Sequence, residues 1–328
     1  MIDGRGELIY VGKARSLRAR LLSYFRPRSR DPKAGRIIAQ TRALVWEAAA
    51  SEFAALLREL ELIRRWQPRW NVQGQPGRRK RGYVCVGRRP APYLFLATRP
   101  PTTAFACFGP VPLGPTVREA VRRLNDWYRL RDCPQAQTMA FADQGELFPV
   151  VRTAGCLRLE IGTCLGPCAA ACTRADYAIA VKAAVRFLEG VDTAPLDRLE
   201  RQMNEASAAL QFERAVVLRD RLRALQRLYH YLERSRRAAE RSCVYPVIGT
   251  DNTERWYLIQ GGRVVTALTT ADAGQRRAAL ETVYRGMPPG PVRLDEIDGV
   301  LLVDAWFRRH PEEWARTLTP AEALRQCE

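Results

Sequence analysis

The start of the chain constrains its fold more than any other segment. Residues 8–14 form a short apolar run that ends in a glycine and a lysine, which predicts a buried strand followed by a tight turn. The basic stretch after it predicts a helix over residues 16–25. This order brings a phenol, an ammonium and a guanidinium to one small site. Such groups can grip a phosphodiester, so the segment predicts a nuclease.

The charge of the chain is unevenly distributed. The 328 residues carry a formal net charge of +18, yet residues 1–90 hold 21 Lys and Arg against 7 Asp and Glu, whereas residues 244–328 hold 10 against 12. The excess of positive charge therefore belongs to the N-terminal part, where it predicts a polyanionic partner. No apolar run approaches the roughly 20 residues of a membrane span, and no signal peptide precedes residue 8, so we expect a cytoplasmic protein.

Cysteines gather in the middle of the chain. Five of the nine lie close together in sequence: Cys133, Cys156, Cys164, Cys168 and Cys172. Structural disulfides are not expected in a cytoplasmic protein, and the spacing C-x7-C-x3-C-x3-C among glycines and prolines is typical of a soft-metal site. Either an iron-sulfur cluster or zinc satisfies this pattern, and buried thiols without a metal are the alternative.

The remaining elements follow from periodicity and capping signals. Strands are expected at 7–12 and 43–46, then between 83 and 109, and at 243–250, 255–259 and 263–268. Helices are expected at 51–66 with Ser51 as N-cap, 116–128, 174–188 with Thr173 as N-cap, and 275–285, and a terminal segment at 301–309. Residues 196–230 read as an antiparallel helical hairpin that breaks near residues 210–212.

The last 85 residues offer carboxylates but no convincing metal site. Four aspartates are candidate ligands, but solvated turns explain them better: Asp251, Asp295, Asp298 and Asp304. The only two histidines are His230 and His310, so acid-base chemistry based on histidine is not expected. The role of residues 243–328 does not follow from the sequence.

Three segments, in the same order, resemble one family. The first is carried by Tyr10 to Ala14, Arg20, Tyr24, Phe25, residues 57–63 and Pro68 to Val72, the second by Cys156 to Cys168, and the third by residues 196–230. They resemble the GIY-YIG nuclease domain, the cysteine segment and the UVR motif of the UvrC excinucleases of bacterial nucleotide excision repair. The resemblance covers residues 1 to about 232.

The resemblance implies a role for each matching residue. Tyr10 would deprotonate or position the attacking water, which a phenol can do only beside cations, and Lys13 and Arg20 are suitable. Arg20 would also hold the scissile phosphate, and Tyr24 would hydrogen-bond within the site. Glu59 would be the single protein ligand of a Mg²⁺ or Mn²⁺ ion that acts as a Lewis acid, and Asn71 would fix the end of its helix.

The resemblance also implies a cluster and two partners. Four of the cysteines would bind a [4Fe-4S] cluster, with zinc as the alternative and Cys172 as a spare: Cys133, Cys156, Cys164 and Cys168. The basic side chains expected to contact the DNA backbone are Arg15, Arg18, Arg78, Arg79, Lys80 and Arg81. The hairpin would dock a UvrB-like protein through Leu210, Phe212, Glu213, Arg219 and Asp220.

The chain departs from the family in two respects. The opening strand with the tyrosine of the GIY-type motif is absent, so either the true start lies upstream of Met1 or part of the site has been lost. We also find neither the second, RNase H-like nuclease nor the helix-hairpin-helix units that normally follow in the family. A catalytically inactive adaptor that binds DNA and UvrB is therefore the alternative to a nuclease. A free-standing GIY-YIG nuclease of mobile elements is disfavoured by the cysteines and the hairpin.

These observations predict an α+β protein with one nuclease centre. The expected domains are a GIY-YIG α/β module at 1–73, a basic linker with a small β/α region at 74–132, a cysteine-rich region at 133–190, a helical hairpin at 191–236 and an α+β domain at 243–328. The expected reaction is one metal-dependent incision beside a lesion or distortion in DNA.

Overall fold

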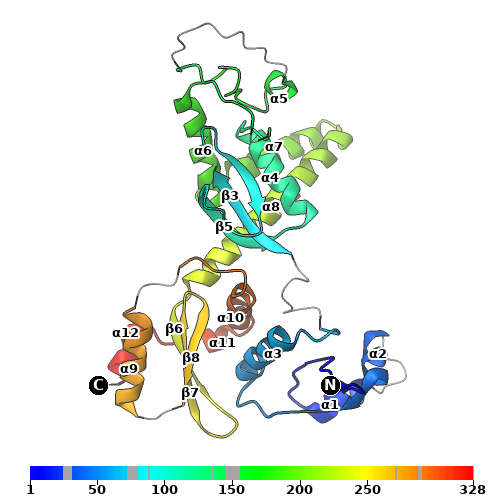
Figure 1. The fold of residues 1–328 in the computed structure, drawn as a ribbon, viewed down its shortest axis with the longest axis vertical. Coiled ribbons are helices and arrows are strands. Elements are labelled where there is room, and N and C mark those ends of the chain that lie inside the picture. Colours follow the sequence, from blue (N-terminus) through cyan, green and yellow to red (C-terminus); the bar gives the residue numbers. More distant parts are fainter. Residues whose placement is uncertain are drawn as a thin grey trace. The chain divides into compact units, whose positions relative to one another are not determined.

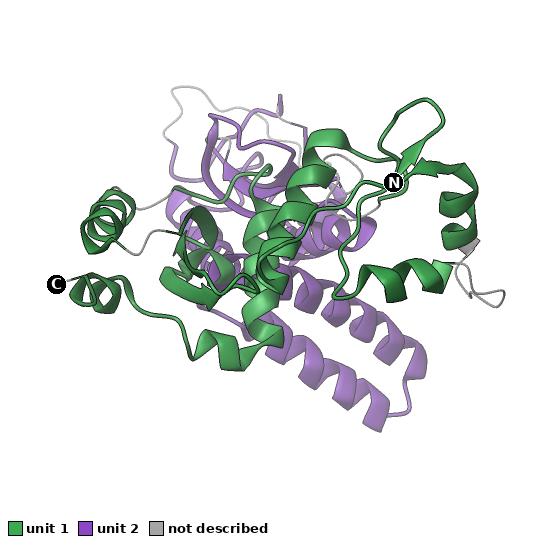
Figure 2. Ribbon diagram, turned by 90° about the horizontal axis from the view of Figure 1, so that it is seen from below, with its two compact units in different colours: residues 1–79, 238–328 green, residues 80–237 purple. Residues whose placement is uncertain are grey.

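The computed structural model describes most of the chain, namely residues 1–24, 32–71, 80–87, 89–134, 136–144, 156–269, 272–286 and 290–327. The chain divides into two compact units (Figure 2). Unit 1 comprises residues 1–79 together with residues 238–328, and unit 2 comprises residues 80–237. The N-terminal and C-terminal segments therefore share one unit although more than 150 residues separate them in sequence.

The N-terminal half of unit 1 is built on a very short sheet. Its elements are β1 (Ile2–Asp3), α1 (Leu17–Tyr24), α2 (Pro32–Gln40), β2 (Thr41–Ala43) and α3 (Glu52–Trp66). β1 pairs antiparallel with β2, with Ile2 opposite Ala43. The strand expected at 43–46 is wrong in position, because pairing with the short β1 ends at Ala43. The strand expected at 7–12 is reduced to an isolated bridge between Ile2 and Leu8.

Helix α3 forms where the sequence predicts it. The Ser51 hydroxyl accepts a hydrogen bond from the Ala54 N–H at 3.1 Å, which satisfies one of the free donors of the first turn. At the other end Gln67 adopts a left-handed conformation with φ of 44°, and its N–H donates to the Ile63 carbonyl. Pro68 then prevents the helix from continuing.

The C-terminal half of unit 1 is a sheet covered by helices on both faces (Figure 1). Its elements are β6 (Cys243–Ile248), β7 (Glu254–Gln260), β8 (Arg263–Leu268), α9 (Ala273–Tyr284), α10 (Ile297–Arg309), α11 (Pro311–Trp314) and α12 (Pro320–Arg325). The strands form an antiparallel meander in the order β6-β7-β8. Side chains alternate between the two faces of a strand. Val244 and Leu258 accordingly pack towards α9 and α12, whereas Tyr245 and Tyr257 pack towards α10 and α3.

Unit 2 begins with a second antiparallel sheet. Its elements are β3 (Arg81–Gly87), β4 (Tyr93–Ala97), β5 (Ala104–Pro112) and α4 (Pro115–Trp127), and the strand order is β4-β3-β5. Asn125 of α4 fastens the helix to the sheet, because its side-chain amide donates to the Leu94 carbonyl at 2.8 Å and accepts from the Leu94 N–H at 3.0 Å. A buried Asn paired in this way satisfies both backbone groups of Leu94.

The rest of unit 2 is helical. Its elements are α5 (Leu157–Glu160), α6 (Arg174–Leu188), α7 (Ala194–Ala208) and α8 (Phe212–Glu240), whose last three residues belong to unit 1. The predicted N-cap of α6 is confirmed, since Thr173 and Asp176 form a reciprocal capping box. The predicted break in the helical hairpin is also confirmed, at Leu210, which has a φ of 56°. The α+β class is therefore confirmed, and no described helix is long and apolar enough to cross a membrane.

Candidate active site

A hairpin at the N-terminus places Tyr10. The Asp3 carboxylate accepts hydrogen bonds from the N–H groups of Arg5 at 2.9 Å and Glu7 at 3.1 Å, which closes the turn between the two arms. The backbone bond from Arg5 is the main cause that lowers the pKa of Asp3. The Met1 ammonium donates to the Tyr10 carbonyl at 2.9 Å, so the two arms of the hairpin meet at the residue expected to carry the chemistry.

Asn71 fixes the segment that follows Tyr10. Its side chain accepts from the Val11 N–H at 2.9 Å and donates to the Val11 carbonyl at 2.8 Å, and the Trp70 N–H donates to the Ile9 carbonyl at 3.0 Å. The Asn71 side chain is buried. Trp70 and Asn71 together therefore tie the segment after α3 to the backbone on either side of Tyr10, and the side chain of Asn71 makes the bonds to Val11.

Tyr10, Arg20 and Tyr24 form one cluster. The Tyr10 and Tyr24 rings lie 6.4 Å apart in an edge-to-face arrangement, and the Arg20 guanidinium lies 5.1 Å from the centre of the Tyr24 ring. A side-chain hydrogen bond with Tyr10 is the main cause that raises the pKa of Arg20. Burial raises the pKa of Tyr24 to about 12, a hydrogen bond with Tyr10 adds to this rise, and the charge of Arg20 opposes it. Tyr24 is thus a neutral hydroxyl at physiological pH.

The absence of a side chain at Gly12 leaves room for the Tyr10 ring. A Cβ atom on Gly12 would lie 2.8 Å from both Cε1 and the hydroxyl oxygen of Tyr10. Real Cβ atoms do not approach other atoms so closely, so a larger residue at this position would displace the Tyr10 hydroxyl.

Glu59 lies in the same site on α3 and is half-buried. Burial raises the pKa of Glu59, while the charge and backbone N–H of Lys13 and the charge of Arg20 oppose the rise. The Lys13 ammonium does not pair with Glu59. It lies 3.0 Å from Glu52, which also binds Arg15 at 2.6 Å. Glu52 is a member of this site that the sequence reasoning missed, although its spacing of seven residues from Glu59 puts both carboxylates on one helix face.

A divalent metal fits Glu59. The carboxylate is partly buried and accepts the Lys13 N–H, and none of the ion pairs found among the described residues includes it, so a cation can approach it. In the described part of the chain, no three His, Cys, Asp or Glu side chains come close enough to hold a metal by themselves. Glu59 is the residue of this site that would hold such an ion.

The basic residues expected on DNA lie in both units. Arg18 and Lys80 are exposed, Arg15 is exposed but bound to Glu52, and Arg81 is half-buried in β3. The other two, Arg78 and Arg79, lie outside the described residues.

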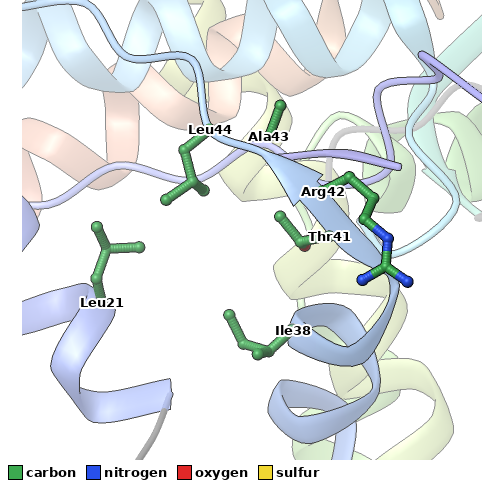
Figure 3. Close-up of a pocket in the computed structure, with 6 residues that line it drawn as sticks. All are labelled: Leu21, Ile38, Thr41, Arg42, Ala43 and Leu44. Carbon is green, nitrogen blue, oxygen red and sulfur yellow. The ribbon is translucent and has the colours of Figure 1, made fainter. Parts of the chain in front are cut away.

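A separate hollow lies within the N-terminal half of unit 1 (Figure 3). It has a volume of about 350 Å³, and the side chains of Leu21, Ile38 and Leu44 converge on it. Thr41, Arg42 and Ala43 complete the lining. None of these residues was predicted to be functional, and the lining offers a single charged group, so this hollow lacks the chemistry of the Tyr10 cluster.

The cysteine segment is organised by two arginines. Arg158 of α5 binds Asp126 at 2.8 Å and Asp132 at 2.9 Å and donates to two backbone carbonyls. Arg131 is buried, lies 4.8 Å from the centre of the Tyr93 ring, and donates to the Cys133 sulfur at 3.4 Å. These contacts hold the loops that carry the cysteines.

The four predicted cluster ligands lie within electrostatic reach of one another in part. Burial raises the pKa of Cys168, and the charges of Cys133 and Cys156 raise it further. Burial also raises the pKa of Cys164, which lies within electrostatic reach of Cys156 and Cys168. Gly166, with a φ of 68°, permits the tight turn between them, because a Cβ there would meet Leu159 at 2.7 Å. Thiolates suit a soft metal or cluster in their chemistry, but in the described residues no three of these side chains come close enough to hold one as they stand. Cys172 is buried in the hydrophobic core that Cys133 and Cys168 also contact.

The tip of the helical hairpin exposes apolar side chains. Leu210 is 73% exposed and Phe212 is 61% exposed, while Glu213 is exposed and Arg219 pairs with Asp220 at 3.0 Å. Exposed apolar groups of this size at a helix junction are typical of a docking surface.

The carboxylates near the C-terminus do not form a site. Asp251 and Asp295 lie in turns and pair with Arg255 and Arg293, and Asp298 lies in the first turn of α10. The expectation of a solvated turn is wrong for Asp304, which is 1% exposed within α10 and lies 3.4 Å from Arg241. His230 is exposed beside Glu233, and His310 lies against the Trp306 ring with centroids 4.1 Å apart.

Comparisons with known proteins define the class of this chain. Residues 1–72 match the UvrC-like GIY-YIG domain, residues 83–187 match the middle domain of the UvrC/Cho excinucleases, and residues 193–228 match the UvrB/uvrC motif. The chain is thus a protein with a GIY-YIG nuclease domain of the UvrC type. No solved structure matches it.

The chain belongs to the UvrC family. It is 33% identical over 228 residues to UvrABC system protein C of Ectopseudomonas mendocina, an alignment that covers 70% of this chain and 36% of the relative. It is 35% identical over 224 residues to UvrABC system protein C of Desulforudis audaxviator, covering 68% of this chain and 34% of the relative. The chain therefore spans about a third of the length of the curated relatives it matches, and none of the three family models reaches beyond residue 228.

Proposed function

We propose that this chain is a structure-selective DNA endonuclease that makes a single metal-dependent incision in nucleotide excision repair. The observation that carries the proposal is the convergence of Tyr10, Arg20, Tyr24 and Glu59 in one site within a UvrC-like GIY-YIG domain. A phenol, a guanidinium and a partly buried carboxylate together supply a base, a phosphate-binding cation and a metal ligand.

The hydrogen bonds around Tyr10 suit it to accept a proton. The neutral hydroxyl of Tyr24 and the guanidinium of Arg20 both hydrogen-bond with Tyr10. As donors they would stabilise the negative charge on the Tyr10 oxygen after its proton has passed to solvent water, and Tyr10 could then take a proton from the attacking water. The hydrogen bond from Tyr24 also fixes the direction of the Tyr10 hydroxyl.

Arg20 and Glu59 would act on the phosphate. Arg20 is exposed, so its guanidinium can bind two oxygens of the scissile phosphate while it holds Tyr10. A Mg²⁺ or Mn²⁺ ion held by Glu59 would supply Lewis-acid stabilisation of the leaving oxygen. Contacts of Arg18 and Lys80 with the DNA backbone would add affinity without sequence preference.

The cysteine segment would stabilise the loops of unit 2, and the helical hairpin would bind a partner protein. A [4Fe-4S] cluster, or zinc, held by Cys133, Cys156, Cys164 and Cys168 would fix the loops of unit 2. The exposed hairpin tip at Leu210 and Phe212 would bind a UvrB-like protein, as the match to the UvrB/uvrC motif supports.

The test is nicking of a lesion-bearing duplex with Mg²⁺ or Mn²⁺, with and without a UvrB-like partner. The chain is compared with Glu59→Ala and with the matched control Glu61→Ala, which changes an exposed carboxylate on the same helix. Nicking that is lost only in Glu59→Ala supports the nuclease. Binding of DNA and of the partner without nicking by any form would leave the inactive adaptor as the function of the chain.

A further inference from the structure

Helix α3 carries the acidic residues of the site on one face and an aromatic anchor on another. Glu52 and Glu59 are seven residues apart, so they share a face, and both interact with Lys13. Phe53, Leu57 and Arg64 recur at helical spacing on a face turned by about a third of a turn from it. This second face meets the C-terminal half of unit 1, where its neighbour is α10 (Figure 1).

Phe53 is enclosed by the C-terminal half of the unit. It is 0% exposed, and its ring lies 5.2 Å from Tyr245 and 5.0 Å from Tyr257, both edge-to-face, and 5.5 Å from Trp306. Val303 and Phe307 of α10 complete the cluster. Aromatic pairs at these distances contribute beyond the area they bury, so Phe53 is a strong point of attachment.

Further contacts join α3 to the C-terminal half of unit 1. The Thr250 N–H, in the turn after β6, donates to the carbonyl of Ala50, just before the N-cap Ser51, at 2.8 Å. Beyond Phe53, Leu56 and Leu57 pack against the same cluster, and the Arg64 side chain lies close to Gly299 of α10. The sheet β6-β7-β8 and α10 thus contact α3 before, at and beyond the turn that carries Glu59.

We infer that residues 238–328 brace α3 and thereby position Glu59, with Phe53 as the positioning residue at the centre of the brace. Phe53 does not touch the reacting atoms and acts through the helix that it anchors. In the described residues of the N-terminal half, the sheet consists of two strands of two and three residues, and α3 is held there by the polar contacts of Glu52 and Glu59 with Lys13 and Arg15. The inference gives a role to a segment that none of the three family models matches, and it rests on the proposed function.

The test uses two buried valines of α10 whose side chains pack in different hydrophobic clusters. Val303 and Val300 are each 1% exposed, but Val303 packs in the Phe53 cluster, whereas Val300 packs against Ala238 and Val292. Val303→Ala, Val300→Ala and Phe53→Leu are made in the full chain. Hydrogen exchange of the α3 amides is measured together with the nicking rate at saturating substrate and the Mn²⁺ concentration that gives half of this rate.

We expect Val303→Ala and Phe53→Leu to increase exchange in α3 and to lower the saturated nicking rate, each by about tenfold. Val300→Ala, which removes the same methyl groups from the same helix, should leave both within about twofold. Equal effects of the two valine substitutions on α3 exchange would overturn the brace. If the unaltered chain does not nick, the proposed function fails, yet the exchange measurement still decides whether residues 238–328 hold α3.

Discussion

The side-chain amide of Asn71 completes both backbone hydrogen bonds of Val11, donating to its carbonyl at 2.8 Å and accepting from its N–H at 2.9 Å. Sixty residues separate the two in sequence, so this pair closes the N-terminal half of unit 1 around Tyr10. A backbone segment outside any strand is thereby held by one side chain.

Asn71→Ala should destabilise unit 1 by about 1–3 kcal/mol, because it leaves two backbone groups of Val11 without partners. Nicking should fall with it, since Tyr10 precedes Val11. Urea unfolding measures the loss. The control is Asn204→Ala, an exposed asparagine on α7, which should change stability by less than about 0.5 kcal/mol. Equal stability of the two variants would contradict the role given to Asn71.

Gly12→Ala should separate activity from stability. The added Cβ must displace the end of the Tyr10 side chain, which lies 2.8 Å away, so we expect nicking to fall about tenfold while the fold persists. Gly35→Ala is the control, because open space surrounds that residue within α2 and alanine favours a helix by about 1 kcal/mol over glycine. A Gly12→Ala protein with full activity would show that the position of Tyr10 is not critical.

Glu59→Gln should abolish nicking without loss of stability. Burial raises the pKa of Glu59, so the folded state holds this proton more tightly than the unfolded state does. The protonated Glu59 side chain therefore contributes fully to stability when the pH is below the ordinary pKa of glutamate. This contribution is lost as the pH rises through the raised pKa of Glu59. At neutral pH the neutral glutamine avoids the cost of burying a charged carboxylate. The unfolding free energies of the variant at pH 4 and pH 7 should therefore differ less than those of the unaltered chain.

Nicking by Glu59→Gln should fall by about two orders of magnitude or more, on the scale of a lost Lewis acid. Glu61→Gln on the same helix is the control, and we expect it to keep full activity. Equal losses in the two variants would mean that general charge on α3, rather than a metal at Glu59, supports the reaction.

Tyr24→Phe should lower the nicking rate by about a hundredfold, the scale on which one donor to a developing charge acts. The pKa of Tyr24 is raised to about 12, so its hydroxyl remains a donor to Tyr10 well above neutral pH. Its contribution to stability is full below the ordinary tyrosine value near 10 and is lost as the pH rises through about 12. The phenylalanine variant should lack this alkaline loss, which circular dichroism between pH 9 and 12 can follow.

Tyr229→Phe, in unit 2, is the control for this substitution, because its hydroxyl donates only a long bond of 3.4 Å to Gly190. A Tyr24→Phe protein that nicks as fast as Tyr229→Phe would remove Tyr24 from the mechanism.

The sequence predicts the helices whose starts are marked by residues close by in the chain. Caps and periodicity locate α3 through Ser51 and α6 through Thr173, because these signals lie within one helical turn of the helix they start. Family spacing likewise locates Tyr10 and Glu59. The attachment of Phe53 to Tyr245 could not be predicted, because it joins residues that lie nearly 200 positions apart with a whole unit between them. Glu52 was missed for a related reason: its spacing was visible, but its pairing with Lys13 joins residues 39 positions apart.

Single Cys→Ser substitutions should distinguish the four cysteines that bind the metal from Cys172, which does not. Substituting Cys133, Cys156, Cys164 or Cys168 should remove most of the bound iron and sulfide, or zinc, measured in anaerobically purified protein. Burial and neighbouring thiols raise the pKa of Cys168, so the metal-free site holds protons that metal binding must release. Affinity should therefore rise with pH. Cys172→Ser should keep the metal, because Cys172 packs in the core, and equal loss in all five variants would refute the four-ligand assignment.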